Sequence, residues 1–333
     1  MFDAWVDRSS GRTENVDMPA DGTASTPHIG ITLSIIAEVG DDASTLDNVP
    51  AAAREVEQAG LDSVWVPDVI TGDSRPALEP MTVLAAAAGA TNRIELGTCI
   101  LALPLRQLAW TATQVQTLQY ISGNRLVLGT GIGGFTGEPF WRAVRAPTKR
   151  RGPWLDDALD TLPRLVAGEK VDPDGAGVPI ALQPATPMPP LRIAGNADAV
   201  LARAVRHGGW FGGGAGSGGP ETLRPGLDRL REIAAEVGMP MPRVTVAPEV
   251  TLGVAGAAGK ARDERAAGLV AEGFITAEEA ARIPIAQSVG QVVDALGAYL
   301  DVGVDELVTG PAGEGADWLR GLEMIAEGKR QLT

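Results

Sequence analysis

The chain has 333 residues, 44% of them hydrophobic and 21% charged, which is typical of a folded globular protein with a sizeable core. Its formal net charge of -14 repels the phosphates of nucleic acids and of anionic lipids, so neither is expected as a partner. The single cysteine permits no internal disulfide and no cysteine-built zinc site. The two histidines are far apart in the sequence, so we expect no metal site.

The first 27 residues are polar, with scattered glycine, proline, serine and threonine, and predict a mobile tail before one domain over residues 28–333. They lack the basic start and the continuous apolar run of a secretory signal. No later stretch offers the roughly 18 uninterrupted apolar residues of a membrane span. These features predict a cytoplasmic protein.

Short runs of apolar and β-branched residues recur from residue 28 onward. Their hydrophobicity is nearly continuous, as in strands that are buried on both faces. The eight predicted strands are 28–35, 62–66, 94–101, 125–133, 191–195, 209–214, 243–254 and 305–310.

Each predicted strand is followed by at least one segment of helical periodicity. The segments are 46–60, 80–91, 107–122, 154–168, 197–208, 221–238, 259–282, 288–302 and 316–328, and Pro163 is expected to kink or split the fourth. Eight strand–helix units in about 300 residues predict a closed (β/α)8 TIM barrel. The alternative, an open doubly wound sheet, usually carries GxGxxG after its first strand, and that sequence does not occur there.

Three predicted connections are long: 134–153 after the fourth strand, 169–190 after the fourth helix, and 255–287 after the seventh strand. Long connections are often functional. The first and the third leave the carboxyl ends of strands, the end at which barrel enzymes hold their substrates.

Position in the barrel selects among the residues that could carry chemistry. His28 begins a strand and His207 ends a helix, so both are interpreted as structural, and without a GxSxG sequence a serine hydrolase is not indicated. Asp68 follows the second strand and Glu249 lies in the seventh, where either carboxylate could orient a ring nitrogen or act as a base. The alternatives are a helix cap or a loop salt bridge for Asp68 and a buried basic partner for Glu249.

Glycines gather where the fourth, fifth and sixth strands end. Gly195 and Asn196 stand at the start of a helix, where free backbone N–H groups bind phosphate. Tight barrel loops need glycine in any case, but three neighbouring glycine-rich loops favour a cofactor that bears phosphate. Arg106 and Arg151 follow strands three and four and are candidates either for anion binding or for surface ion pairs.

The segments "NRIELGTCILALPLRQ" and "SGNRLVLGTGIG" resemble, in order and spacing, the bacterial luciferase-like family of flavin- and deazaflavin-dependent oxidoreductases. The resemblance extends over about residues 28–328 and implies the same TIM barrel. It also implies that the ring of FMN or of coenzyme F420 lies over the barrel mouth. In many members a bulge with a non-prolyl cis peptide supports the ring, and the matching positions are Thr98, Cys99 and Ile100.

Further cofactor contacts are carried over from the resemblance. It implies a phosphate site at the loop after strand five, with help from the glycines after strand six, and glycines that flank the ring after strand four. The matching residues are Gly195, Asn196 and Ala197 for the first, Gly212 and Gly213 for the second, and Gly131 and Gly133 for the third.

The sequence gives conflicting signals about the cofactor. Many deazaflavin-dependent members carry Asp-His after strand two, whereas this chain has Asp68 and Val69, yet a Cys-Ile pair at the bulge also occurs among deazaflavin enzymes. The first hypothesis is a monooxygenase that uses reduced FMN from a separate flavin reductase, with oxygen, on a small organic substrate. The alternatives are an F420-dependent hydride-transferring oxidoreductase and a non-catalytic flavin-binding protein.

The resemblance also implies a homodimer, for which the alanine-rich segment 80–91 is a candidate contact. The aromatic residues after strand four predict either an apolar pocket or core packing, and they are Phe135, Phe140, Trp141 and Trp154. No histidine is placed to activate the thiol of Cys99. We therefore predict that the backbone at Cys99 and Ile100 supports the ring and that the sulfur only fills space.

Overall fold

A computed structural model of the chain describes residues 27–37, 46, 48–70, 76–134, 137–173, 175–213, 218–271 and 275–332. The predicted tail lies outside the described residues except for Pro27, and so does Phe135. The division into a tail and one domain therefore stays a prediction.

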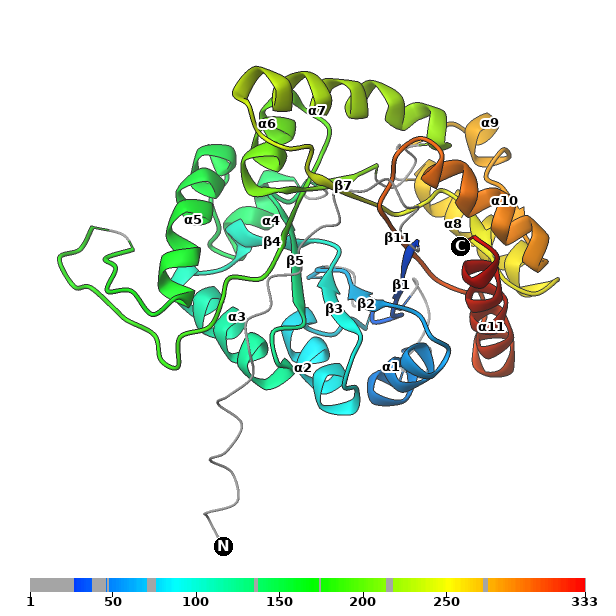
Figure 1. Cartoon of the computed structure of the whole chain (residues 1–333), viewed down its shortest axis with the longest axis horizontal. Coiled ribbons are helices and arrows are strands. Elements are labelled where there is room, and N and C mark those ends of the chain that lie inside the picture. The colour runs from blue at the N-terminus through cyan, green and yellow to red at the C-terminus, as the bar shows by residue number, and fades with distance from the viewer. Residues whose placement is uncertain are drawn as a thin grey trace, which may run out of the picture.

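Eight parallel strands form a closed barrel at the centre of the molecule (Figure 1). They are β1 (His28–Thr32), β2 (Ser63–Val66), β3 (Glu95–Thr98), β5 (Leu126–Gly131), β6 (Leu191–Ala194), β7 (Gly209–Gly212), β8 (Arg243–Val246) and β11 (Glu306–Thr309). The hydrogen-bonded order is β3-β2-β1-β11-β8-β7-β6-β5, and pairing of β3 with β5 closes the ring. The predicted TIM barrel is confirmed.

Helices surround the barrel and bury one face each against it (Figure 1). They are α1 (Val49–Gln58), α2 (Pro80–Ala90), α3 (Leu108–Ser122), α5 (Arg151–Val166), α6 (Asp198–His207), α7 (Arg224–Val237), α10 (Val289–Leu300) and α11 (Gly315–Gln331). In α1, the Asn48 side chain caps the first turn, and the buried residues Val49, Ala52, Ala53 and Val56 recur at helical spacing. Most of the apolar core lies in this layer between helices and strands.

Two predicted strands are interrupted and resume further along the chain. The third is interrupted after Thr98 and resumes as β4 (Leu101–Ala102). The predicted strand 243–254 leaves the barrel after Val246, because Pro248 has no N–H with which to continue the ladder. It resumes as β9 (Thr251–Leu252), which pairs with β10 (Ile285–Ala286) outside the barrel.

The helical predictions are corrected in three places. The predicted loop 134–153 contains α4 (Glu138–Ala143), and the predicted segment 259–282 divides into α8 (Ala257–Ala271) and α9 (Ala277–Ala280). A capping box at Thr276 starts α9 anew. Pro163 does not split α5, because it stands in the last turn, where little helix remains to be distorted.

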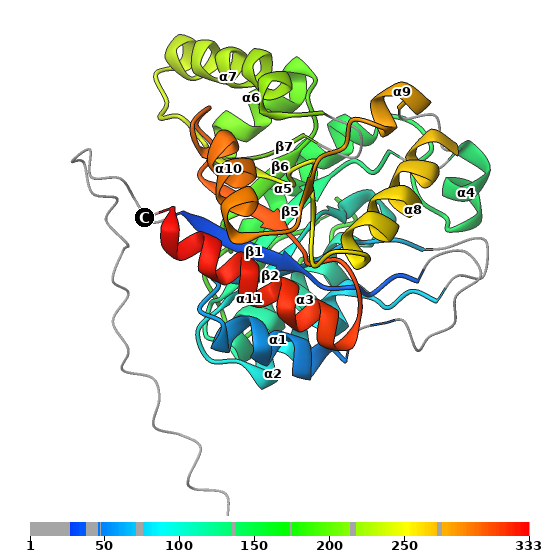
Figure 2. The same cartoon turned by 90° about the vertical axis from the view of Figure 1, so that its right-hand side faces the viewer.

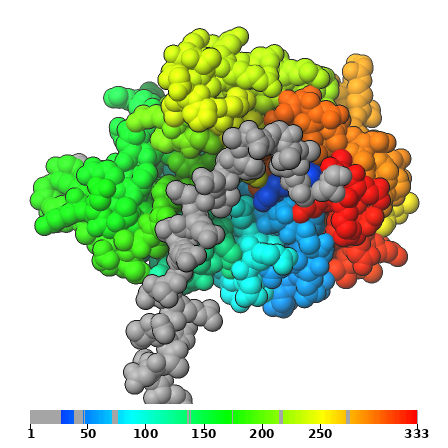
Figure 3. Space-filling view, in the orientation of Figure 1, coloured from blue at the N-terminus to red at the C-terminus, as the bar shows by residue number. Residues whose placement is uncertain are grey.

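The two ends of the barrel differ in what covers them. Helices α4, α8 and α9 lie together at the end toward which the strands run (Figure 2). The connection after α5 instead projects sideways, as a lobe at the left of the space-filling view, with a bridge between Val171 and Ile180 (Figure 3). Among the described residues, no helix is long and apolar enough to cross a membrane.

An ion-pair network joins five strands, β1, β3, β6, β8 and β11, at the opposite, amino-terminal end. His28 Nδ1 lies 2.9 Å from Glu306 Oε1, and His28 Nε2 lies 3.3 Å from Glu95 Oε2. Arg192 and Arg243 approach Glu306 to 3.4 and 3.8 Å. An imidazole and two carboxylates are possible metal ligands. Because opposite ring nitrogens face different carboxylates, and two guanidinium groups adjoin, we interpret this cluster as a network of ion pairs.

The network makes the stability of the barrel depend on pH. Burial alone would lower the pKa of His28, but the Glu306 and Glu95 carboxylates outweigh burial and raise the pKa to about 9. The stabilisation is therefore complete below the unfolded-state pKa of about 6.5 and is lost as pH rises through about 9. We expect His28→Gln to lower the free energy of unfolding by about 3 kcal/mol at about pH 6 and by much less near pH 10.

Urea unfolding of both proteins across this pH range measures the difference. His207→Gln is the matched control. Burial lowers the pKa of His207, so this imidazole is neutral in both the folded and the unfolded chain above about pH 7.5. The effect of His207→Gln on the free energy of unfolding should therefore not decline between about pH 7.5 and 10. A His28→Gln effect that stays constant up to about pH 10 would contradict the network.

Candidate functional site

The sequence-predicted site residues lie along one continuous arc of the barrel mouth. Asp68 follows β2, the predicted bulge ends β3, Gly131 and Gly133 end β5, the predicted phosphate loop follows β6, and Gly212 and Gly213 end β7. These strands are consecutive neighbours in the ring, and β8, which precedes Glu249, comes next. Because the strands are parallel, all of these residues reach the same end of the barrel.

The end of the third strand carries one extra residue. On the near side of the break Gly97 pairs with Val127, and on the far side Leu101 pairs with Thr130. The third strand thus advances by four residues while β5 advances by three, which defines a β-bulge at the mouth. The peptide between Cys99 and Ile100 is cis, as the family resemblance implies.

Hydrogen bonds hold this bulge on both sides. Before it, the Thr98 hydroxyl donates to the carbonyl of Gly129 at 2.7 Å, and the Cys99 N–H donates to the carbonyl of Val66 at 2.8 Å. After it, the Thr130 hydroxyl donates to the carbonyl of Leu101 at 2.8 Å. The bulge is therefore tied to both neighbouring strands.

Glycine allows β5 to approach the bulge closely. A Cβ atom on Gly129 would lie 2.0 Å from the Thr98 carbonyl oxygen, and one on Gly131 would lie 3.1 Å from Cδ1 of Ile100. The sequence indicated that this glycine-rich stretch faces a ligand. The structure adds that Gly129 is needed for contact within the barrel itself.

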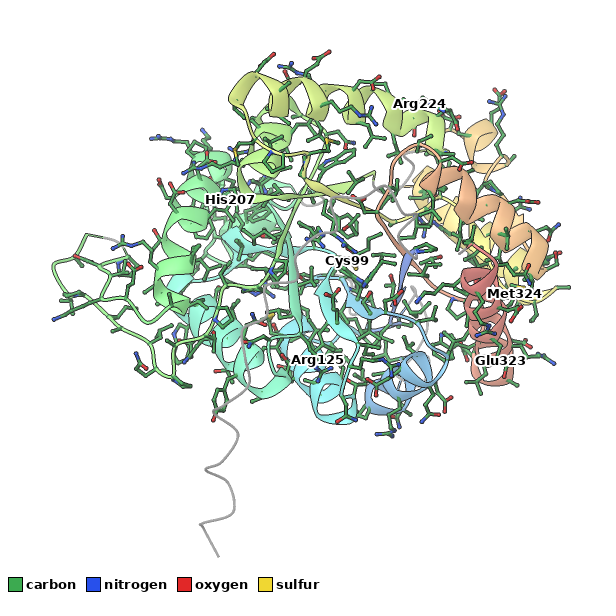
Figure 4. All side chains as sticks on the ribbon, viewed as in Figure 1. Cys99, Arg125, His207, Arg224, Glu323 and Met324 are labelled. Carbon is green, nitrogen blue, oxygen red and sulfur yellow. The ribbon has the colours of Figure 1, made fainter. Side chains whose placement is uncertain are left out.

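A small apolar cluster fills the barrel below the bulge. Trp65 is fully buried, meets Phe211 edge to face at a centroid distance of 5.8 Å, and fits because Gly30 and Gly97 leave room for its indole ring. Cys99 and Ile100 pack on this cluster, and Figure 4 shows Cys99 near the centre of the ring of strands. The bulge thus packs on buried apolar side chains.

The environment of the Cys99 thiol keeps it protonated. Burial raises the pKa of the thiol to about 12, so almost none of it is thiolate near neutral pH. This agrees with the prediction that the sulfur is not a nucleophile.

The loops after β6 and β7 are fixed by one indole group. Trp210 Nε1 donates to the carbonyl of Gly195 at 2.8 Å, and a Cβ on Gly212 would lie 2.6 Å from the Trp210 ring. Gly195 has φ +127°, which favours glycine, and no side chain caps the first turn of α6 behind Ala197. This role of Trp210 was not predicted from the sequence. A tryptophan in a buried strand needs a hydrogen-bond partner for its indole N–H, and this need could have indicated the contact.

The loop after β5 is held by Arg151, for which the sequence predicted either anion binding or a surface ion pair. Gly133 has φ +67°, and Arg151 Nη1 donates to its carbonyl at 3.1 Å. The Arg151 guanidinium also lies 4.0 Å from the centroid of Trp141. Trp141 is buried and Trp154 packs on the main core. Of the two predictions for these aromatic residues, an apolar pocket or core packing, core packing is what the structure shows.

Asp68 is buried in an ion pair. Its side chain is 1% exposed and accepts from Arg106 Nη1 at 2.5 Å and from Nη2 at 2.8 Å. The Ala102 N–H donates to the same carboxylate at 2.9 Å. This is the loop salt bridge that the sequence left as the alternative to a base, and it also explains Arg106.

Glu249 is likewise paired with an arginine. It lies in the bend between β8 and β9 rather than within a strand, because the strand ends at Val246. Arg265 Nε, from α8, donates to Glu249 Oε1 at 3.1 Å. The Tyr299 hydroxyl accepts from the Glu249 N–H and lies 3.3 Å from the Gly218 carbonyl, so it links the loops after β7 and β8.

The family is established by comparison with known proteins. The family model of luciferase-like monooxygenases matches residues 28–325. The chain belongs to this family.

The relatives and solved structures that are similar to this chain include monooxygenases and F420-dependent enzymes by name. An F420-dependent glucose-6-phosphate dehydrogenase of Beutenbergia cavernae is 34% identical over 185 residues, which are 51% of this chain and 54% of the relative. The monooxygenase RslO1 from Streptomyces bottropensis superposes with a TM-score of 0.75 at 19% identity, over 90% of this chain and 98% of its own.

The oxygenating constituent of 3,6-diketocamphane monooxygenase from Pseudomonas putida was solved in complex with FMN. It superposes with a TM-score of 0.73 at 17% identity, over 92% of this chain and 98% of its own. These two structural likenesses show the shared barrel fold.

The contact between Gly129 and Thr98 can be tested directly. We expect Gly129→Ala to displace the bulge and to lower the free energy of unfolding by several kcal/mol, because the new Cβ meets a backbone oxygen that cannot move aside. Thermal unfolding measures this loss. Gly89→Ala in α2 is the control, because its Cβ meets open space and should leave stability equal or slightly higher. Equal stability of Gly129→Ala and the native chain would contradict the contact.

Proposed function

We propose that this protein is a monooxygenase that uses reduced FMN and oxygen to oxidise a small organic substrate. One observation carries the proposal. Among the described residues, the two carboxylates predicted for the mouth both pair with arginines, the bulge thiol is protonated, and an aliphatic side chain, Val69, follows Asp68. The described part of the site therefore offers no group placed for acid-base catalysis, which favours a reaction that the cofactor carries by itself.

The chain's own groups fit a flavin phosphate ester. The bulge at Cys99 and Ile100 offers an apolar support above the Trp65 cluster, and of the glycines that end and follow β5 Gly134 faces open space. The uncapped first turn of α6 offers backbone N–H groups for the phosphate. Asp198 in that turn pairs with Arg229 at 3.1 Å, which reduces its repulsion of an anion.

When bound, reduced FMN supplies the electrons that activate oxygen, and the protein orients the ring and excludes water. A separate flavin reductase is part of this proposal, because reduced FMN has to be regenerated after each turnover. The roles of Thr98, Asn196, Gly213 and the other cofactor-contacting residues carried over from the family belong to the same proposal.

The substrate is expected to be small and apolar. The loop after β2 presents Val69, Ile70 and Leu78 with exposed fractions of 38, 50 and 39%. Exposed aliphatic side chains beside a ligand site favour an apolar ligand.

The alternative is hydride transfer with coenzyme F420. The relative from Beutenbergia cavernae favours it, being an F420-dependent dehydrogenase by name. Hydride removal from an alcohol needs a group that takes the hydroxyl proton. Asp68 and Glu249, the carboxylates predicted for the mouth, are both paired with arginines, which disfavours either as the acceptor of that proton.

A homodimer is also proposed. The outer face of α3 exposes Trp110, Tyr120 and Ile121 by 68, 58 and 51%, next to the small residues of α2. A second copy of this face would bury all three aromatic and aliphatic side chains. Sedimentation as a single 34.4 kDa species at micromolar concentration would contradict it.

Cofactor binding under anaerobic conditions, followed by admission of oxygen, tests the proposed reaction. We expect reduced FMN to bind and then to be reoxidised by oxygen with incorporation of one labelled oxygen atom into an apolar substrate. Tight binding of reduced F420 with no response to FMN would overturn the proposal in favour of the alternative. Binding of FMN without turnover of any candidate substrate would indicate a non-catalytic flavin-binding protein.

A further inference from the structure

We infer that Asp68 is a positioning residue, whose buried ion pair with Arg106 fixes the Cys99–Ile100 bulge in place. The meaning of the bulge as a support for the cofactor ring rests on the proposed function. The mechanical role of Asp68 rests only on contacts within the chain.

Asp68 joins four segments that are separate in the sequence. It follows β2, it accepts the Ala102 N–H of β4, and it holds Arg106 at the start of α3 in a two-pronged ion pair. Arg106 Nη2 also lies 3.5 Å from Glu79, whose carboxylate caps α2 by accepting the Thr82 N–H at 2.8 Å. Displacement of Asp68 would therefore remove the side-chain link between the end of β2 and the segment that follows the bulge, Ala102 to Arg106.

The contact with Ala102 is placed where it controls the bulge. Ala102 is the second residue after Ile100, and its position sets where the chain re-enters the ladder with β5. The other anchors of the bulge are made by neutral hydroxyl and backbone groups. Asp68 is the charged anchor, and charged hydrogen bonds out of solvent are stronger than neutral ones.

The same contacts argue against proton transfer by Asp68. Oδ1 accepts from Arg106, and Oδ2 accepts from Arg106 and Ala102, while only 1% of the side chain is exposed. A base has to reach its substrate within hydrogen-bond distance. The carboxylate is turned toward the chain's own backbone instead.

The test compares Asp68→Asn with Asp156→Asn. Asp156 forms a similar two-pronged pair with Arg203, at 2.5 and 2.9 Å, between the outer helices α5 and α6. Both variants lose one charge and keep the size of the side chain. Only Asp68→Asn is expected to disturb the bulge.

The first measurement needs no cofactor. Cys99 is the sole cysteine and lies in the bulge, so the rate at which an aromatic disulfide reagent labels the protein reports how well the bulge is held. We expect Asp68→Asn to label at least about tenfold faster than the native chain, and Asp156→Asn to stay within about twofold. Equal labelling of all three proteins would overturn the inference.

The second measurement is the affinity for FMN and the visible absorption of the bound ring. We expect Asp68→Asn to bind FMN at least about tenfold more weakly and with a shifted spectrum, whereas Asp156→Asn changes neither. Loss of turnover in Asp68→Asn with native affinity, spectrum and labelling rate would make Asp68 a catalytic residue and contradict positioning. If Asp68→Asn does not fold, Arg106→Lys, which keeps the charge but not the two-pronged geometry, is expected to show the same changes.

The two proposals can fail separately. A native chain that binds neither FMN nor F420 would refute the proposed function. The labelling rates would still decide whether Asp68 fixes the bulge.

Discussion

The close approach of the third strand to β5 is the contact on which both the barrel and its mouth depend. The carbonyl of Thr98 occupies the space that a side chain on residue 129 would need, and the Thr98 hydroxyl donates to the carbonyl of Gly129 in the same place. The pairing of β3 with β5 also closes the ring of eight strands. Closure of the fold and formation of the bulge are therefore consequences of one packing arrangement.

Charge is organised differently at the two ends of the barrel. At the amino-terminal end, the pKa of Glu306 would be raised by burial but is lowered to about 2 by His28 and Arg192, so both partners stay charged over a wide pH range. At the mouth, Asp68 meets Arg106 from the turn before α3, and Glu249 meets Arg265 from α8. Both ends use ion pairs to hold the chain in place, and the bulge itself packs on an apolar cluster inside the barrel.

This division gives the site its chemical character. The residues that touch the mouth shape it through backbone hydrogen bonds, glycine loops and the Trp65 and Trp210 side chains. We propose that the described residues bind and orient a cofactor that carries the chemistry itself. A relative named for F420 chemistry and a structural neighbour solved with FMN are both similar to this chain, so the fold alone does not select the cofactor.

The sequence predicted the barrel because strand and helix periods alternate along the whole chain, and the carboxyl-end rule then placed Asp68 and Glu249 at the mouth. It could not identify their partners, since Arg106 and Arg265 lie 38 and 16 residues away and become neighbours only through the fold. The sequence also did not predict that β8 ends at Val246, because apolar residues continue past Pro248. Long-range contacts decide such details, and periodicity does not record them.

We propose that the backbone at the bulge, and not the thiol, serves the cofactor. Replacement of Cys99 by alanine tests this most directly, with cofactor affinity and turnover measured on the same preparation. The account predicts affinity and turnover close to those of the native chain, because a thiol with a pKa of about 12 takes no part as a thiolate. Loss of turnover with native folding and native cofactor affinity would contradict the account and make the sulfur a chemical group of the site.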